Sequence, residues 1–579
     1  MRDENKRQSD RLSKRSWFRI ILKTAFIIVI LVILLFSAGT FYIYYRGNDL
    51  LKEYLIKTVY SSSKGIYHLE LTKLNINLVT GRTSVSGLHL IPDTSAYNKK
   101  SKSDTLSPFL IDVRISEFQV RGFDIMDIIR KRRIDISKIL IDSPDLTIIL
   151  KKTINRTEKP ASDRKMLSIP LPNGLESLLI RQIILENGRL TIDDQTKETA
   201  EKFIVPLITI SLKNFLVDRT QRGLPRILNS DDILISVKGI SLKSNKGMYT
   251  VTPGEINLST GKSALSITNL KITPTYSRFE FSRKLGYQTD RFDISIAKIV
   301  IQGLDLRQFL INRKFIAGNI LVDGLILNDY RDKHLPPQAD FKPPLPGQTL
   351  LNLKTYVKID NVTFTKGKII YSEQDGDEPG TLYFDKVEGA VSGITNDSVL
   401  VRRNTLVKVK ASMYLMGKGL LNVALEMPLG AKNDAFTFSA TLSKMDLREI
   451  NPMLTKLFPV EIISGLVINN SKISFKADNY KASGKMDFYY KDLKIKMKAR
   501  ENTTRSKIRS GTENWAAKMI VRNANPKNGK FNQGIIYFER DQHKSIFNFL
   551  WKSILSGVKS TIGLNIKEQK ELKKSSTKK

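Results

Sequence analysis

Apolar side chains recur at every second position through much of the chain between residues 66 and 543. Leu74, Ile76 and Leu78, for example, alternate with polar neighbours. A period of two is the period of a β-strand that has one apolar and one polar face. The same alternation recurs at residues 208–212, 233–237, 292–296, 421–425, 486–490 and 493–497.

Short turn signals separate many of these strands, among them Thr80-Gly81-Arg82, Asn187-Gly188-Arg189 and Lys366-Gly367-Lys368. Glycine beside a polar residue is typical of a tight turn between antiparallel strands. The pattern therefore predicts a mainly β chain, folded as an elongated antiparallel β meander with one apolar side.

The chain also repeats itself with a period of 256 − 76 = 180 residues, because INLVTGR at 76–82 returns as INLSTGK at 256–262. Further correspondences follow in the same order. They are 121–125 with 302–306, each opening a short basic helical segment that ends at Arg133 or Lys314, then 141–142 with 322–323, the proline-rich connectors 158–174 with 335–347, and 185–190 with 364–369. Ordered matches of this kind predict serial repetition of one β unit.

These patterns predict the organisation of the chain beyond its N-terminal segment. We expect a first β repeat unit at 46–235, a second at 236–404, a C-terminal β region at 405–543, and an amphipathic helix with a lysine-rich tail at 544–579. Within the C-terminal region, Asp446 and Glu449 have the spacing of a capping box, which predicts a helix that ends near Phe458.

Residues 24–45 are 22 consecutive residues without a charge. A helix of this length spans about 33 Å, enough for the hydrocarbon core of a bilayer. The alternative is a cleaved signal peptide, but the apolar run is long for one and an A-x-A-like cleavage site is not obvious after it. We expect a retained transmembrane helix with residues 1–23 in the cytoplasm, because lysine and arginine precede the span. The residues assigned to this anchor are Trp17, Thr24, Phe26, Tyr42, Tyr44 and Tyr45.

The formal net charge of +37 is spread thinly, since residues 1–23 carry +5 and residues 567–579 carry +4. Nucleic-acid binders concentrate their charge and interleave it with aromatic residues, so we expect no nucleic-acid partner. A diffusely basic surface suits contact with anionic lipid headgroups, although a simple lysine-rich composition remains an alternative.

The sequence contains few candidate catalytic residues. There is no cysteine, and the four histidines, at 68, 89, 334 and 543, are scattered. Asp193-Asp194 and Asp231-Asp232 are typical of solvated or capping carboxylates in turns. Because no nucleotide-binding, hydrolase or metal-binding motif occurs, we expect neither an enzyme nor a bound cofactor.

Residues 544–564 change period and predict an amphipathic helix. Its apolar face is expected to contain Phe547, Leu550, Trp551, Ile554, Val558 and Ile562, with Lys552, Ser556, Lys559 and Ser560 opposite. Two interpretations remain open: the helix lies on a membrane surface, or it caps the β structure with its apolar face.

The C-terminal region carries a more specific likeness at residues 446–454 (DLREINPML), 463–467 (ISGLV) and 489–494 (YYKDLK). Together with the anchor, the duplicated one-faced meander and the lack of catalytic motifs, these stretches resemble the AsmA-like family of bacterial envelope proteins, relatives of TamB and of the bridge-like lipid transfer proteins. The resemblance implies a sheet curled along its length into an open groove that is apolar inside.

The resemblance also implies a function: an inner-membrane-anchored periplasmic protein that conducts phospholipids passively and supports outer-membrane lipid homeostasis. Its partners would be phospholipids, the inner membrane and an outer-membrane or periplasmic protein. The alternative is a non-enzymatic envelope scaffold or assembly factor with an ordinary packed β core. The expected groove-lining residues are Ile76, Leu78, Ile210, Leu212, Ile256, Leu258, Ile294, Ile296, Val423, Leu425, Phe488 and Ile495.

Overall fold

The computed structural model describes residues 48–77, 81–100, 107–123, 132–151, 175–196, 201–218, 230–244, 247–458, 460–497 and 521–564. Strands account for 58% and helices for 17% of the described residues, which confirms the prediction of a mainly β chain. The chain divides into two compact units: residues 1–242 with 254–262, and residues 243–253 with 263–579. The predicted repeat and domain boundaries stay predictions.

The first unit is built on one sheet. Its elements are α2 (Asn48–Ser62), β1 (Tyr67–Glu70), β2 (Lys73–Asn77), β3 (Arg82–Pro92), α3 (Thr94–Lys100), β4 (Phe109–Phe123), β5 (Arg133–Asp142), β6 (Asp145–Leu150), β7 (Ser177–Asp194), β8 (Glu201–Asp218), β9 (Asp232–Lys238) and β12 (Glu255–Ser259). Strands β1 and β2 both pair with β3, and β4 pairs with β3, β5 and β6. The order then continues through β7, β8 and β9 to β12.

The core of the first unit lies on one face of this sheet, against α2. Leu55 of α2 belongs to the same buried cluster as Val85, Phe118 and Ile139 of the strands. Strands β4, β5 and β7 contribute mostly alternate side chains to this cluster, as the sequence predicts.

The second unit is larger. Its elements are β11 (Tyr249–Thr252), β13 (Ala264–Pro274), α5 (Arg278–Leu285), β14 (Asp290–Gln302), η2 (Gln308–Asn312), β15 (Phe315–Asp332), α6 (Pro346–Leu351), β16 (Val357–Gln374), β17 (Gly380–Thr395), α7 (Ser398–Arg402), β18 (Leu406–Leu415), β19 (Gly419–Pro428), η3 (Lys432–Asp434), β20 (Phe436–Leu442), β21 (Met445–Asp446), η4 (Leu447–Ile450), α8 (Asn451–Leu457), β22 (Val460–Val467), β23 (Ser471–Ala477), β24 (Lys481–Asp487), β25 (Tyr490–Met497), β26 (Gly534–Glu539) and α10 (Ile546–Ile562). The short strand β10 (Leu242–Ser244) lies where the two units meet in the sequence.

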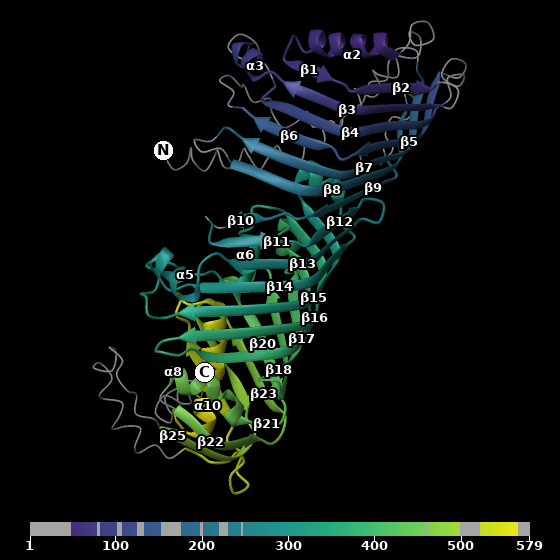
Figure 1. Cartoon of the computed structure of the whole chain (residues 1–579). Helices are drawn as coiled ribbons and strands as arrows, with labels where there is room; N and C mark the ends of the chain where they lie inside the picture. The colour runs from purple at the N-terminus through teal and green to yellow at the C-terminus, as the bar shows by residue number, and fades with distance from the viewer. Residues whose placement is uncertain are drawn as a thin grey trace. The chain divides into compact units, whose positions relative to one another are not determined.

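Most of the strands of the second unit follow one another across the sheet in chain order, as Figure 1 shows for β13 to β18. The pairings run β11–β13–β14–β15–β16–β17–β18–β19–β20 and then β23–β24–β26. Strands β21, β22 and β25 form a separate three-stranded sheet.

The expectation of a purely antiparallel meander is wrong, because the sheet is mixed. Strand β15 runs parallel to β16, and β5 and β6 run parallel to β7. Parallel neighbours need a long connection that returns the chain to the same end. In the second unit this connection runs from Asp332 to Val357 and contains α6 and the proline-rich segment 335–347.

The two parallel junctions use corresponding residues. Ile141 is the register partner of Leu185 in the first unit, and Val322 is the partner of Phe364 in the second. These are positions that correspond between the two copies of the repeated sequence. Tyr67 likewise pairs with Pro92, as Tyr249 pairs with Pro274. The repeated sequence therefore forms the same strand pairs twice.

Two of the expected turns are bulges inside long strands. Asn187 and Lys366 adopt positive φ angles of 53°, and the strand register shifts at the glycine that follows each of them, in β7 and β16. A bulge accommodates one extra residue without ending the strand. Asn-Gly and Lys-Gly therefore bend these strands instead of separating two shorter ones.

Two local expectations in the C-terminal region also need correction. Residues 447–457 are helical, as η4 and α8, but the Asp446 side chain accepts from Arg448 N at 2.9 Å, and a reciprocal capping box with Glu449 is not formed. The strand expected at 486–490 ends at Asp487 in β24, and β25 begins at Tyr490.

Helix α10 packs against β24 and β26 through small residues. A Cβ atom built on Gly534 of β26 would lie 2.6 Å from Gly557 O of α10, so the backbones approach closely. Ser556 and Ser560, expected on the side opposite to the apolar face of this helix, contact the sheet. Their hydroxyl oxygens accept from Tyr537 N at 3.2 Å and from Ile535 N at 2.7 Å. These contacts satisfy two backbone N–H groups of β26.

The expected transmembrane helix at 24–45 and the lysine-rich tail lie outside the described residues. No helix within the described ranges combines the length and the apolar character needed to cross a membrane.

Candidate functional site

Two uninterrupted rows of apolar or glycine residues cross the sheet of the second unit. Each row takes one residue from each of β13–β20, β23, β24 and β26, and neighbours in a row are register partners. Row A consists of Leu265, Ile301, Ile320, Val362, Val391, Val409, Leu425, Phe438, Phe475, Gly484 and Ile536. Row B consists of Ile267, Ile299, Val322, Phe364, Gly389, Ala411, Val423, Ala440, Ile473, Met486 and Gly534.

Rows A and B share one face of the sheet, because their residues are two positions apart on every strand. The residues between them belong to the opposite face. On β18 to β24 they are mostly polar and include Lys410, Ser439, Ser474 and Lys485. The sheet of the second unit therefore has a continuous apolar face and, over these strands, a polar one.

Burial changes along the two rows. From β20 onward, where α10 packs, Phe438, Phe475 and Ile536 are 5%, 3% and 1% exposed. From β13 to β19 the rows are half-buried throughout, except at Ile301 and Val322, which are buried. The C-terminal part of the apolar face thus resembles an ordinary core, whereas the stretch from β13 to β19 is only partly covered.

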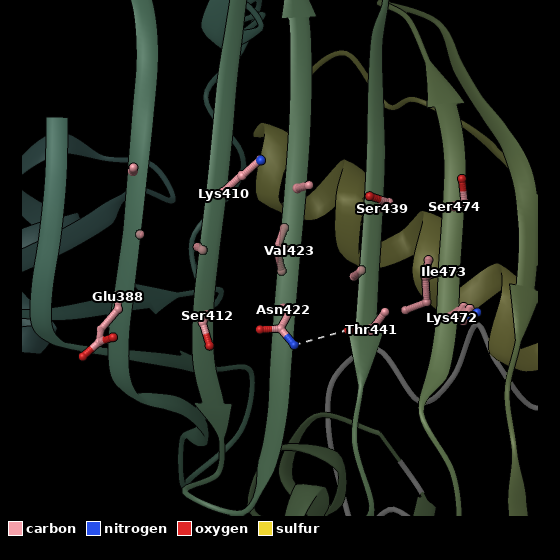
Figure 2. Close-up of a pocket in the computed structure, with 15 residues that line it drawn as sticks. Glu388, Lys410, Ser412, Asn422, Val423, Ser439, Thr441, Lys472, Ile473 and Ser474 are labelled. Atoms are coloured by element: carbon pink, nitrogen blue, oxygen red, sulfur yellow. Dashed lines mark hydrogen bonds between the residues drawn. The ribbon is translucent and has the colours of Figure 1, made fainter. Parts of the chain in front are cut away.

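A hollow of about 690 Å³ lies over β17, β18, β19, β20 and β23. Figure 2 shows its lining residues on these neighbouring strands. Its central row is the part of row B that contains Gly389, Ala411, Val423, Ala440 and Ile473. Three of these five residues are glycine or alanine, so little side-chain volume stands above the backbone there.

The first unit has a comparable apolar row across β2, β3, β4, β5, β7, β8, β9 and β12. It consists of Leu74, Val85, Phe118, Ile141, Leu185, Ile210, Ile235 and Leu258. Its first four residues are buried and its last four are half-buried. The same contrast between a packed stretch and a partly covered stretch therefore occurs within each unit.

Most of the expected groove-lining residues lie on these apolar faces. Those that do are half-buried, namely Ile76, Ile210, Leu212, Ile256, Leu258, Ile294, Ile296, Val423 and Leu425. Phe488 is buried between β24 and β25, and Ile495 belongs to the three-stranded sheet. Leu78 and the anchor residues Trp17, Thr24, Phe26, Tyr42, Tyr44 and Tyr45 lie outside the described residues.

The expected apolar face of α10 is divided between packing and exposure. Leu550, Ile554 and Val558 are half-buried against the core, whereas Phe547 is 78% and Trp551 38% exposed. The apolar residue of α10 that is buried most deeply is Phe549, which the helical-face pattern did not include. The helix turns its small residues to the sheet, and this rotates Phe547 and Trp551 outward.

A group of charged residues interrupts the apolar face near β14, β15 and β16, and sequence analysis did not identify it. Arg331 donates two hydrogen bonds to Asp290, with Nε–Oδ1 at 2.5 Å and Nη2–Oδ2 at 2.7 Å. Tyr371 donates to Glu373 at 2.6 Å, and Lys333 pairs with the same carboxylate. The sequence feature that could have revealed this group is the set of polar residues that interrupt the apolar alternation at the C-terminal end of β15.

Asp329 lies within this group, in register with Tyr371. Burial, followed by the negative charge of Asp290, raises the pKa of Asp329 to about 7, against a lowering effect of Arg331. Burial and the neighbouring Glu373 carboxylate raise the pKa of Tyr371, so its hydroxyl stays protonated and remains a donor.

Among the described residues, no group of three or more His, Cys, Asp or Glu side chains could hold a metal ion. No family model matches the chain, and no curated protein matches it in sequence.

Proposed function

We propose that this is an inner-membrane-anchored periplasmic protein that shields phospholipid acyl chains and conducts them passively along its apolar β face. The proposal rests on the observation that most residues of rows A and B are only half-buried from β13 to β19. A soluble domain usually covers such a face with a second layer. The proposal assigns that covering to acyl chains.

The physical chemistry of the face suits lipid movement. Each methylene group that leaves water contributes about 0.8 kcal/mol, whichever aliphatic side chain it contacts. Because rows A and B change little from strand to strand, a lipid meets no deep minimum along them. Seven strands spaced by ~4.8 Å give a path of about 29 Å from β13 to β19. Direction would have to come from partner proteins or from lipid gradients.

The membrane location rests on the sequence. The 22 uncharged residues at 24–45 follow a basic segment, which places the bulk of the chain outside the cytoplasm. Cysteine is absent, which is compatible with an oxidising compartment. These features support a single-pass protein of a bacterial inner membrane, in agreement with the AsmA-like resemblance.

A second candidate is a non-enzymatic scaffold or outer-membrane assembly factor. The buried stretches favour it, since Val85 and Phe118 in the first unit and Phe475 in the second are as enclosed as any globular core. The two candidates differ in what contacts the half-buried stretch from β13 to β19: lipid in one case and protein or water in the other.

The test is native mass spectrometry with lipid extraction on the full chain purified from membranes. Leu425→Glu places a charge on row A, and Ala424→Glu places the same charge on the opposite face of β19 as a matched control. The proposal expects several phospholipids per chain in the wild type and in Ala424→Glu, and a marked loss in Leu425→Glu. A folded, lipid-free wild type would favour the scaffold.

A further inference from the structure

Asp329 lies on the apolar face of the second unit. It follows Leu327 by two residues on β15, so the two side chains share a face. Leu327 is in register with Ile294 and Ile369, both apolar. A carboxyl group therefore stands directly beside a row of aliphatic residues, where a polar side chain is normally unfavourable.

The charged residues around Asp329 are already matched with one another. The guanidinium of Arg331 is held by Asp290, and the ammonium of Lys333 is paired with Glu373. Both positive charges are thus compensated. Within the described ranges, no basic side chain forms an ion pair with the carboxyl group of Asp329.

One oxygen of the Asp329 carboxyl also lacks a hydrogen-bond donor. Its Oδ1 is shielded from solvent, and within the part of the chain that the structure describes no donor reaches it. An enclosed acceptor without a donor is energetically unfavourable. A ligand that supplies an N–H group and a positive charge would recover this cost.

We propose that Asp329 binds the primary ammonium group of an ethanolamine-type phospholipid whose acyl chains lie on the adjoining apolar rows. This inference rests on the proposed function and adds a headgroup preference to it. The geometry points away from anionic headgroups, because Arg331 and Lys333 are already paired. It also points away from choline headgroups, because a trimethylammonium has no N–H to donate.

The size of the preference for ethanolamine headgroups follows from the strength of the hydrogen bond to Asp329. A hydrogen bond to a charged group contributes about 1.5–3 kcal/mol, so an ethanolamine lipid should be enriched about tenfold or more over a choline lipid. The contact is local and leaves the apolar rows unchanged. Removing the carboxylate should therefore abolish the preference without reducing total lipid binding.

The experiment uses the full chain in detergent, offered equal amounts of dioleoyl phosphatidylethanolamine, phosphatidylcholine and phosphatidylglycerol. Bound lipid is extracted and quantified by mass spectrometry. Asp329→Asn keeps the shape of the side chain and removes its charge. Asp293→Asn is the matched control, because Asp293 is in register with Asn328 and belongs to the opposite face.

Ethanolamine enrichment in the wild type and in Asp293→Asn, lost in Asp329→Asn at constant total lipid, supports the proposal. Equal uptake of the three lipids by the wild type, or an enrichment that survives Asp329→Asn, overturns it and leaves the lipid-binding function standing. A wild type that takes up no lipid overturns the proposed function, and the headgroup preference with it.

Discussion

Filling the hollow over β17–β20 and β23 should weaken acyl-chain binding without unfolding the sheet. Ala411 lies in row B at the centre of this hollow and is half-buried. The substitution Ala411→Leu adds about three carbon atoms, which would displace a similar number of lipid methylenes. At about 0.8 kcal/mol per methylene the loss is about 2.4 kcal/mol, or roughly fiftyfold in the dissociation constant.

A local reporter can measure this loss. The chain has no cysteine, so a single Val391→Cys substitution, on row A two residues from Gly389 of the hollow, can carry an environment-sensitive fluorophore. Titration with a single-chain lipid then gives the dissociation constant at the hollow. Ser412→Leu adds comparable bulk one residue away, on the opposite face, and serves as the control.

The expected result is a weakening of up to about fiftyfold for Ala411→Leu and a change below twofold for Ser412→Leu. Thermal unfolding should shift little for either variant, since both sites are half-buried. Wild-type affinity in Ala411→Leu would refute the reasoning, and so would an equal loss in both variants.

Four further outcomes are expected. Leu258→Glu should leave the first unit folded, by circular dichroism, while reducing co-purified lipid, because Leu258 is half-buried on β12; loss of the fold would contradict this. Gly534→Ala should destabilise the docking of α10 by about 1–3 kcal/mol, seen as faster amide exchange in that helix, because its Cβ would collide with backbone. Asn525→Ala should cost about 2–4 kcal/mol in thermal unfolding, because the fully buried amide donates to two backbone carbonyls; an unchanged midpoint would count against that role. The wild type should lose stability relative to Asp329→Asn as the pH rises from 5 to 8. The pKa of Asp329 is about 7 in the folded chain, whereas the carboxyl of the unfolded chain is already ionised, so the protonation that stabilises the folded state is lost over this range. Parallel curves of stability against pH for the two proteins would refute this.

The faces of the strands could be predicted from the sequence because a period of two fixes which side chains share a face. Val423 and Leu425 were assigned to the apolar side in this way, and the registers of β18, β19 and β20 place them in rows B and A. The duplication was visible for the same reason, since corresponding residues form corresponding pairs.

The direction of the strands could not be predicted from alternation, which is identical in parallel and antiparallel pairs. The proline-rich segment 335–347 was recognised as a connector, but its role in returning the chain for a parallel β16 required the structure. Asn187-Gly188 has the composition of a hairpin turn, and only its pairing with β8 reveals a bulge.

The orientation of α10 could also not be predicted from the helical pattern of apolar residues. Hydrophobic periodicity favours a buried Phe547–Trp551 face, but the close approach of Gly534 to Gly557 selects the face with serine and glycine. Likewise, Asp329 is one polar residue in a long strand. Its position among paired charges depends on β14 and β16, which lie beside it only in the folded sheet.

Site-specific photo-crosslinking in cells tests the central claim most directly. A photoreactive amino acid would be placed in the full chain at Val409 or Leu425 on row A, and at Lys408 or Lys410 on the opposite face. The account predicts phospholipid adducts at Val409 and Leu425 and few or none at the two lysines. Adducts of equal yield on both faces, or protein adducts alone at the row A positions, would contradict it.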